Sequence, residues 1–291
     1  MPLLAEYKAS LKNATIEEYV DLVIFRPLAF LFVKVIYRSN ITPNQITLLS
    51  MVTGIFSGVM FGIGKSTAII IGGLLLAFAT IFDCADGQLA RLKNNGTPFG
   101  RILDGVVDYI YTVAAFVGIA IGGRNGSMDP LLWWVFVSLA GGSYAVQAGL
   151  LDYYRNEFLA HLKGSNGFIE NELSNAKREL EKLQPLKGHY VERLMLEVYI
   201  RYSSYQNRLR PAKRIDVNSI PTDYVKSNSV MIRLWALNGT STHVFALVGC
   251  AFIGRLDMFL WYILGFGSLY TVVLYVVQRT LSETKRTRRK R

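Results

Sequence analysis

Four aspartates in two neighbouring apolar stretches are the residues of this chain best suited to chemistry. Asp83 and Asp86 lie three residues apart, and Asp104 and Asp108 lie four residues apart in the next stretch. A carboxylate close to hydrocarbon is costly unless it is paired, solvated or bound to a cation, so intramembrane acids are functional candidates. Carboxylate oxygens are the ligands that Mg²⁺ and Mn²⁺ prefer. The four aspartates therefore predict a divalent-metal site.

Small residues accompany the aspartates at fixed positions. The full pattern reads D-x2-D-G-x2-A-R-x8-G-x3-D-x3-D, and its members besides the aspartates are Gly87, Ala90, Arg91 and Gly100. Residues three or four apart share one face of a helix, and glycine and alanine allow two helices to approach closely. The pattern therefore predicts two helices that meet around a carboxylate-lined pocket. Arg91, at one end of the pattern, is suited to hold a phosphate.

The alternative interpretation is a set of interfacial salt bridges, in which Arg91, Lys93 and Arg101 neutralise the aspartates. Three cations do not balance four acids, and salt bridges leave the glycine and alanine spacing unexplained. Cys84 lies inside the cluster and is expected to fill space rather than bind the ion, because hard cations prefer oxygen. We therefore favour a functional site.

The elements that must position these residues are expected to be membrane-spanning helices. The chain has 291 residues, is 51% hydrophobic and 18% charged, and has a mean hydropathy of +0.27, which is typical of an integral membrane protein. A spanning helix needs about 20 largely apolar residues. The expected fold is therefore an all-α membrane protein with six transmembrane helices, at windows free of Lys, Arg, Asp and Glu: Thr42–Gly64, Ser66–Phe82, Tyr109–Gly123, Pro130–Leu151, Leu234–Gly254 and Met258–Gln278.

The second and third windows reach full length only if their helices extend into the aspartate-bearing sequence. The first aspartate pair then ends one helix, the second pair begins the next, and both meet at one face of the membrane. Six spans place both termini on that face as well. The loops on the other face carry only Lys65, Arg124 and Arg255 of the 32 basic residues, so the positive-inside rule predicts that the aspartates and both termini face the cytoplasm.

The net charge of +11 lies mainly on the same face and includes a basic tail, residues 282–291. We interpret this tail as a topology signal that contacts anionic lipid rather than nucleic acid, because the aromatic residues of the chain lie in apolar segments and not among the basic ones. The expected location is the plasma membrane of a prokaryote.

Two further segments are expected at the cytoplasmic surface. Apolar and charged residues alternate around Pro27, which predicts an interfacial amphipathic helix over residues 16–39 that bends at the proline. An additional spanning segment is the alternative there, and the charges argue against it. Residues 155–233 are rich in charge and carry apolar residues at helical spacing, which predicts a cytosolic insertion of two helices. Residues 1–291 are thus expected to form a single integral-membrane domain.

Polar residues near the ends of two other spans are candidates for a second binding site, which we call the acceptor site. Arg155 follows the fourth apolar window and either binds an acceptor phosphate or caps a helix end at the interface. Asn238 and His243 belong to a polar run in the fifth window. They either line an acceptor or lipid cavity or form hydrogen bonds between helices.

The aspartate pattern resembles the signature of the CDP-alcohol phosphatidyltransferases, which are integral membrane enzymes of phospholipid biosynthesis. Every signature position from Asp83 to Asp108 is present, and the resemblance extends over Ile41–Gly123. It implies a transferase that moves a substituted phosphate group from a CDP-alcohol donor to an acceptor hydroxyl and releases CMP. It also implies two bound Mg²⁺ or Mn²⁺ ions and a homodimer.

The resemblance assigns roles to individual residues. Asp83, Asp86 and Asp104 would ligate metal. Asp108 would touch the second ion and act as the general base that deprotonates the acceptor hydroxyl. The residues that would border or contact the CDP are Asn44, Gly87, Ala90, Arg91, Gly100 and Asp104.

The pattern leaves the substrates open, because it concerns the CDP and not the acceptor. One interpretation is a CDP-diacylglycerol donor with an acceptor such as glycerol phosphate, serine, inositol or inositol phosphate. The alternative is a CDP-polyol or CDP-aminoalcohol whose head group is transferred to a lipid alcohol.

Three other functions fit the pattern less well. A membrane prenyltransferase also binds diphosphate through metal-bridged aspartates, but typically in two separate clusters. A transporter with a cation site carries its acids near the middle of the membrane and on several helices. An inactive relative is disfavoured because all four aspartates are retained.

Overall fold

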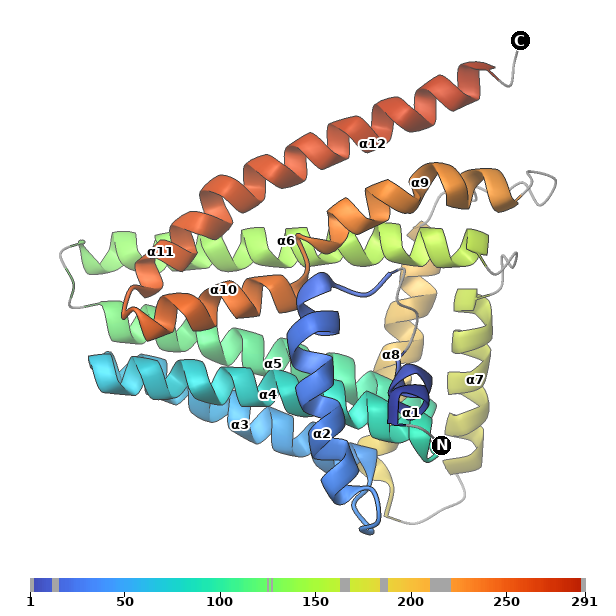
Figure 1. The fold of residues 1–291 in the computed structure, drawn as a ribbon, viewed down its shortest axis with the longest axis horizontal. Helices are drawn as coiled ribbons and strands as arrows, with labels where there is room; N and C mark the ends of the chain where they lie inside the picture. The colour runs from blue at the N-terminus through green and yellow to red at the C-terminus, as the bar shows by residue number, and fades with distance from the viewer. Residues whose placement is uncertain are drawn as a thin grey trace.

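The computed structural model describes residues 3–11, 16–124, 126, 128–162, 168–183, 188–209 and 221–288, and these ranges form helices without any strand (Figure 1). The all-α prediction is thereby confirmed for the described residues. The bundle consists of helices that lie alongside one another: α3 (Pro43–Ile63), α4 (Ser66–Leu92), α5 (Pro98–Gly123), α6 (Pro130–Leu162) and α10 (Thr240–Phe252).

Two of the bundle helices begin where the sequence supplies a cap followed by a proline. The Thr42 side chain accepts a hydrogen bond from the Gln45 N–H, and the Gln45 side chain accepts one from the Thr42 N–H, which forms a capping box at the start of α3. The Thr97 hydroxyl caps α5 by accepting from the Gly100 N–H at 2.9 Å. The proline that follows each cap has no N–H to satisfy, so it favours a helix start. These caps fix where both helices begin.

Helices α3 and α5 approach each other through small residues. A Cβ atom added to Gly58 would lie 2.3 Å from the carbonyl oxygen of Ala114, and one added to Gly118 would lie 2.0 Å from the carbonyl oxygen of Gly58. Only glycine fits at such backbone contacts. Helix α3 also packs along α4. It therefore sets the spacing between the two aspartate-bearing helices.

Five described helices are long and apolar enough to cross a membrane, where six were expected. They are Pro43–Ile63, Ser66–Leu92, Pro98–Gly123, Pro130–Leu159 and Leu256–Thr280. The last one joins three elements without a break, α11 (Leu256–Trp261), η2 (Tyr262–Gly267) and most of α12 (Ser268–Arg288). The window predicted as a span at Leu234–Gly254 is instead divided between α9 (Pro221–Ala236) and α10, whose 13 residues extend only about 20 Å.

The division of that window has a local cause. Gly239 is the N-cap of α10 and has an extended backbone, with φ −87° and ψ 167°. Asn238 donates a hydrogen bond of 2.7 Å from Nδ2 to the Thr271 hydroxyl on α12. A Cβ atom on Gly239 would lie 2.0 Å from the Glu18 carboxyl carbon, so the break also admits a side chain from another segment. Mean hydropathy does not register such a break, which is why the sequence suggested one continuous helix.

The N-terminal arm, residues 16–36, crosses the bundle at a steep angle (Figure 1). It consists of a π-helical turn, η1 (Asp21–Phe25), that continues directly into α2 (Arg26–Ile36). Leu31 and Val35 are exposed on its outer face. The interfacial location expected for residues 16–39 stays a prediction. The inner face packs on α4 and buries Phe25, Ala29, Phe30 and Val33.

The stretch predicted as an insertion begins inside α6, which continues through Leu162. Two helices were expected there, whereas the described part of the stretch contains α7 (Phe168–Leu183), α8 (Tyr190–Leu209) and most of α9. The cytosolic location of the insertion stays a prediction. Helices α7 and α8 pack on the start of α5 through a buried cluster of Ile102, Ala176 and Leu196. Residues 163–167, 184–187 and 210–220 of this stretch, and residues 289–291 of the basic tail, lie outside the described ranges.

Candidate active site

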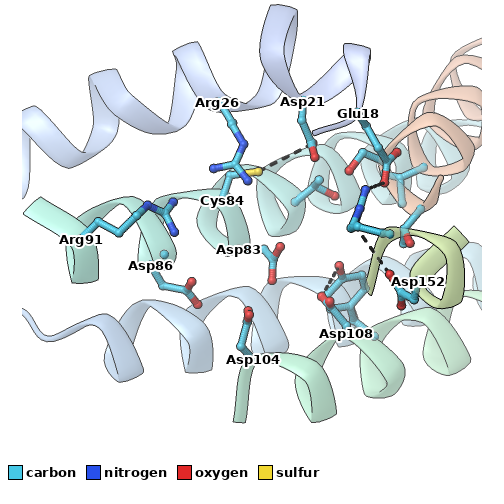
Figure 2. A pocket seen from close by; sticks show the side chains of 17 residues that line it. Glu18, Asp21, Arg26, Asp83, Cys84, Asp86, Arg91, Asp104, Asp108 and Asp152 are labelled. Carbon is cyan, nitrogen blue, oxygen red and sulfur yellow. Dashed lines mark hydrogen bonds and ion pairs between the residues drawn. The ribbon is translucent and has the colours of Figure 1, made fainter. Parts of the chain in front are cut away.

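A cavity of about 190 Å³ gathers charged side chains from segments that are far apart in the sequence (Figure 2). Its walls come from α4, α5, the N-terminal arm, the second half of α6 and the start of α10. The charged residues that line it are Glu18, Asp21, Arg26, Asp83, Asp86, Arg91, Asp104, Asp108, Asp152 and Arg155.

Three of the four predicted metal ligands converge in this cavity. Asp83 and Asp86 come from α4, Asp104 comes from α5, and one carboxylate oxygen of each lies within 4.8 Å of the others. We call these three residues the carboxylate triad. The i, i+3 spacing on α4 places the first two on one face, as the sequence predicted. The Thr47 hydroxyl on α3 donates a hydrogen bond of 2.5 Å to Asp86.

The triad fits a divalent cation by its chemistry. The Oδ1 atom of Asp83 is buried and has no hydrogen-bond partner among the described residues, which leaves a ligand atom available. The cavity is lined by seven carboxylates and three guanidinium groups, so it has an excess of negative charge. The candidate ligands are carboxylate oxygens, which suit Mg²⁺ and Mn²⁺. Cys84 also lines the cavity, with its Sγ 3.9 Å from Asp21 Oδ1, but it is not part of the triad.

Asp108 lies in the same cavity, one helical turn beyond Asp104 on α5, and is not part of the triad. Its Oδ1 accepts a hydrogen bond of 2.8 Å from the Tyr111 hydroxyl. This bond holds one carboxylate oxygen in place, and the carboxylate lies in the cavity where a general base would be needed. The geometry therefore separates the three clustered carboxylates from a fourth that lies beside them.

Only some of the residues expected to contact CDP line the cavity. Gly87 and Arg91 line the cavity, whereas Asn44, Ala90 and Gly100 are not among its lining residues. The Arg91 Nε donates to the Ser10 carbonyl oxygen at 2.5 Å, which attaches α1 (Leu3–Ser10) to the end of α4.

Glycine leaves room for a polar neighbour at two of these positions. A Cβ atom on Gly100 would lie 2.9 Å from Asn44 Oδ1, and one on Gly87 would lie 3.3 Å from a terminal nitrogen of Arg91. Glycine at each position therefore gives the polar side chain space to lie against the helix.

Of the three candidates for the acceptor site, one lines the cavity and two do not. Arg155 reaches the cavity, where one terminal nitrogen lies 3.8 Å from Glu18 Oε1 and the other lies 3.6 Å from Asp152 Oδ1. Asn238 is buried in its contact with α12 and does not line the cavity. His243 is also buried and lines a smaller apolar pocket.

Sequence reasoning missed the contribution of the N-terminal arm, which supplies Glu18, Asp21 and Arg26 to the cavity. The Thr242 N–H near the start of α10 donates to Glu18 Oε2 at 3.1 Å. Burial raises the pKa of Glu18 to about 8, and repulsion from Asp21 adds to this, while Arg155 opposes it. The only sequence signal was the presence of these charges in an otherwise apolar segment.

The match to known proteins falls on the segment that contains the aspartates. Residues 40–161 match the family model of the CDP-alcohol phosphatidyltransferases. This segment includes every position of the aspartate pattern and the greater part of the bundle. It excludes the N-terminal arm and α10, which supply part of the cavity wall.

Several proteins of similar sequence are named as synthases or transferases. A phosphatidylinositol phosphate synthase from Corynebacterium glutamicum is 30% identical over 141 residues, which are 48% of this chain and 56% of the relative. An archaetidylinositol phosphate synthase from Pyrococcus horikoshii is 31% identical over 115 residues, which are 39% of this chain and 55% of the relative. A bifunctional IPC transferase and DIPP synthase from Aquifex aeolicus is 35% identical over 100 residues, 34% of this chain and 22% of the relative. The chain thus spans about half the length of the first relatives it matches.

Proposed function

We propose that this chain, whose residues 40–161 are a CDP-alcohol phosphatidyltransferase domain, transfers a substituted phosphate group from a CDP-linked alcohol to an acceptor hydroxyl. The observation that carries the proposal is the carboxylate triad with Asp108 beside it in one cavity. Phosphoryl transfer depends mainly on positioning and on neutralising the charge that develops on phosphate oxygens. The cavity offers groups for both tasks.

In this mechanism Asp83, Asp86 and Asp104 hold divalent ions, Mg²⁺ or Mn²⁺. When bound, such ions neutralise the charge on the phosphate oxygens and on the departing CMP. Asp108 accepts the proton of the acceptor hydroxyl. At the same time the hydroxyl oxygen forms a bond to the phosphorus that carries the donor alcohol. The bond from that phosphorus to the bridging oxygen breaks, and CMP leaves with that oxygen. Tyr111 keeps the Asp108 carboxylate oriented through its 2.8 Å hydrogen bond.

For the substrates, we propose a lipid-linked CDP donor and a phosphorylated polyol acceptor. Two of the relatives described above are named as synthases of inositol phosphate lipids. Arg155 supports a phosphorylated acceptor, because its guanidinium group lies in the cavity and suits phosphate oxygens. The alternative is a CDP-polyol or CDP-aminoalcohol donor that reacts with a lipid alcohol.

The proposed location is a prokaryotic membrane, with the cavity and both termini at the cytoplasmic face. The basic residues gathered on that face support this orientation. The short helix α10 is proposed to join the five longer helices as a sixth membrane-embedded helix, because it packs along α4 inside the bundle.

The test is CMP release by the purified protein in lipid nanodiscs with Mn²⁺ or Mg²⁺. We expect release with CDP-diacylglycerol and inositol phosphate, less with unphosphorylated inositol, and none after chelation. Release only with CDP-inositol or CDP-ethanolamine and diacylglycerol would select the alternative donor class. Absence of CMP release with every donor, in a preparation that remains folded, would refute the proposed function.

A further inference from the structure

Arg26 is a buried arginine in the cavity wall that the aspartate pattern does not include. It is the first residue of α2, lines the cavity and is only 7% exposed. Figure 2 shows its guanidinium group directed from the N-terminal arm toward the side of the cavity that also holds Arg91. Arg26 lies outside residues 40–161, the segment that matches the family model.

The π-helical turn before Arg26 accounts for its direction. The Arg26 N–H donates to the carbonyl oxygen of Asp21, five residues earlier. In an α-helix, residues five apart point in different directions, whereas a π turn brings their directions closer together. Both side chains therefore face the cavity. The Gln88 side chain on α4 donates to the Arg26 carbonyl oxygen at 3.1 Å and fixes this part of the arm.

The guanidinium group of Arg26 is only partly satisfied by its neighbours. Its Nε lies 2.8 Å from Glu17 Oε2, in a pair that is almost completely buried. Its NH1 atom is also buried and has no hydrogen-bond partner among the described residues. A buried donor without a partner costs free energy. The position therefore favours an additional acceptor.

The surroundings of Arg26 indicate an anion as that acceptor. Arg91 lies close enough to repel it electrostatically, and both guanidinium groups line the same cavity. Two like charges in a largely buried site are stabilised when an anion lies between them. The carboxylates of the triad are expected to be occupied by cations. Asp21 also attracts Arg26, but it does not accept a hydrogen bond from NH1, so a ligand would supply the anion that this donor lacks.

We infer that Arg26, together with Arg91, binds phosphate oxygens of a substrate. This inference rests on the proposed function and extends it to a residue outside the family segment. The diphosphate of the CDP donor is the first source, because Arg91 belongs to the motif expected to contact CDP. The phosphate of the acceptor is the second source, and it presents the same chemistry.

The direct test measures binding without turnover. Calorimetry in Mn²⁺ should show that Arg26→Gln weakens binding of CDP by about 10- to 100-fold, the loss expected for a charged hydrogen bond, and leaves binding of cytidine unchanged. Arg26→Lys should retain part of the affinity. Arg38→Gln, the same substitution at an exposed position after α2, is the matched control and should bind CDP like the wild type.

Glu17 provides the control for a purely structural role. If Arg26 only neutralises Glu17, the Glu17→Gln variant should show the same defect, and the double variant Glu17→Gln/Arg26→Gln should recover CDP affinity. If Arg26 binds phosphate, the double variant should fold normally and keep the defect, because both buried charges are removed together.

Kinetics then identify the source of the phosphate. A rise in KM for the CDP donor alone assigns Arg26 to the diphosphate, and a rise in KM for inositol phosphate alone assigns it to the acceptor. Unchanged KM values for both, with unchanged CDP binding, would overturn the inference.

Inorganic pyrophosphate separates this inference from the proposed function. Its binding in Mn²⁺ tests the anion site without the nucleoside, so weaker pyrophosphate binding by Arg26→Gln would support the anion site even if the wild type released no CMP. Pyrophosphate binding that is equal in the two proteins would count against it in that case.

Discussion

The Thr47 hydroxyl on α3 donates a hydrogen bond of 2.5 Å to the Asp86 carboxylate on α4, and both side chains are buried. This bond connects α3, which contributes no aspartate to the cavity, to the carboxylate triad. It leaves fewer orientations open to the carboxylate, and it satisfies one of its lone pairs. A group that orients a metal ligand in this way is expected to affect metal affinity.

We predict that Thr47→Val weakens the activation of CMP release by Mn²⁺. Valine has nearly the same shape but no hydroxyl, so Asp86 loses its donor while the packing is kept. The expected effect is a rise of about 10- to 100-fold in the Mn²⁺ concentration for half-maximal activity. A titration of initial rate against Mn²⁺ measures it.

Two variants serve as controls for Thr47→Val. Thr47→Ser retains the hydroxyl and should behave like the wild type. Thr53→Val makes the same substitution on the same helix, where the hydroxyl donates only to the Leu49 carbonyl oxygen, and it should leave the Mn²⁺ requirement unchanged. An equal shift in both valine variants would show that the effect arises from the helix and not from Asp86.

For Asp108 we predict a separation between binding and turnover. Asp108→Asn removes the proton acceptor and leaves the triad intact, so the rate should fall by about 100-fold or more, the lower range for loss of a general base. Affinity for CDP in Mn²⁺ should change little. Single-turnover kinetics and calorimetry on the same preparation check both halves. Full turnover in this variant would exclude the assigned role.

The part of the site on α4 and α5 was predictable because its information is local. Helical spacing places Asp83 beside Asp86, and the length of the apolar windows brings the second pair to the same end of the bundle. The contributions of Glu18 and Arg26 were not predictable in this way. The direction of Arg26 depends on a π-helical turn and on packing against α4, and the position of Glu18 depends on its contacts with the start of α10. These features leave no periodic trace in the sequence. The break at Gly239 was missed for a similar reason, since it depends on the contact of Gly239 with Glu18 and on the hydrogen bond from Asn238 to Thr271.

The contact between α3 and α5 leads to a prediction about stability. In Gly58→Ala the new methyl group would meet the Ala114 carbonyl oxygen at 2.3 Å, so the two helices must separate. We expect a loss of about 1–3 kcal/mol from overpacking, together with reduced activity, because α5 carries Asp104 and Asp108. Denaturation in detergent and CMP release measure the two effects.

Gly62→Ala is the matched control for Gly58→Ala. Gly62 lies one turn further along α3, but the nearest atom to its added Cβ would be 3.8 Å away, which is an ordinary contact. Alanine should be tolerated there or stabilise the helix slightly, since it is the better helix former. Equal destabilisation by both substitutions would mean that the close approach at Gly58 does not limit the packing.

The last prediction concerns Glu18 and pH. Desolvation, followed by repulsion from Asp21, raises its pKa to about 8, against the attraction of Arg155 and the hydrogen bond from the Thr242 N–H. The unfolded chain loses this proton near pH 4.3, about the ordinary value for glutamate. Between these two values the native state binds more protons than the unfolded state, so stability falls as pH rises, by about 1.4 kcal/mol per unit for one such group.

Glu18→Gln cannot ionise, and its side-chain oxygen can still accept from Thr242. The variant should therefore lose less stability than the wild type between pH 6 and pH 8, and it should be the more stable protein at pH 9. Asp21, whose pKa burial also raises, keeps its own contribution in both proteins. Glu6→Gln is the control, because Glu6 is only partly buried and a hydrogen bond from Lys34 lowers its pKa, so its removal should not alter the slope in this range. Thermal denaturation at half-unit intervals of pH compares the three. If Glu18→Gln is less stable than the wild type by the same amount at every pH, Glu18 is ionised throughout this range and stabilises the fold through Arg155.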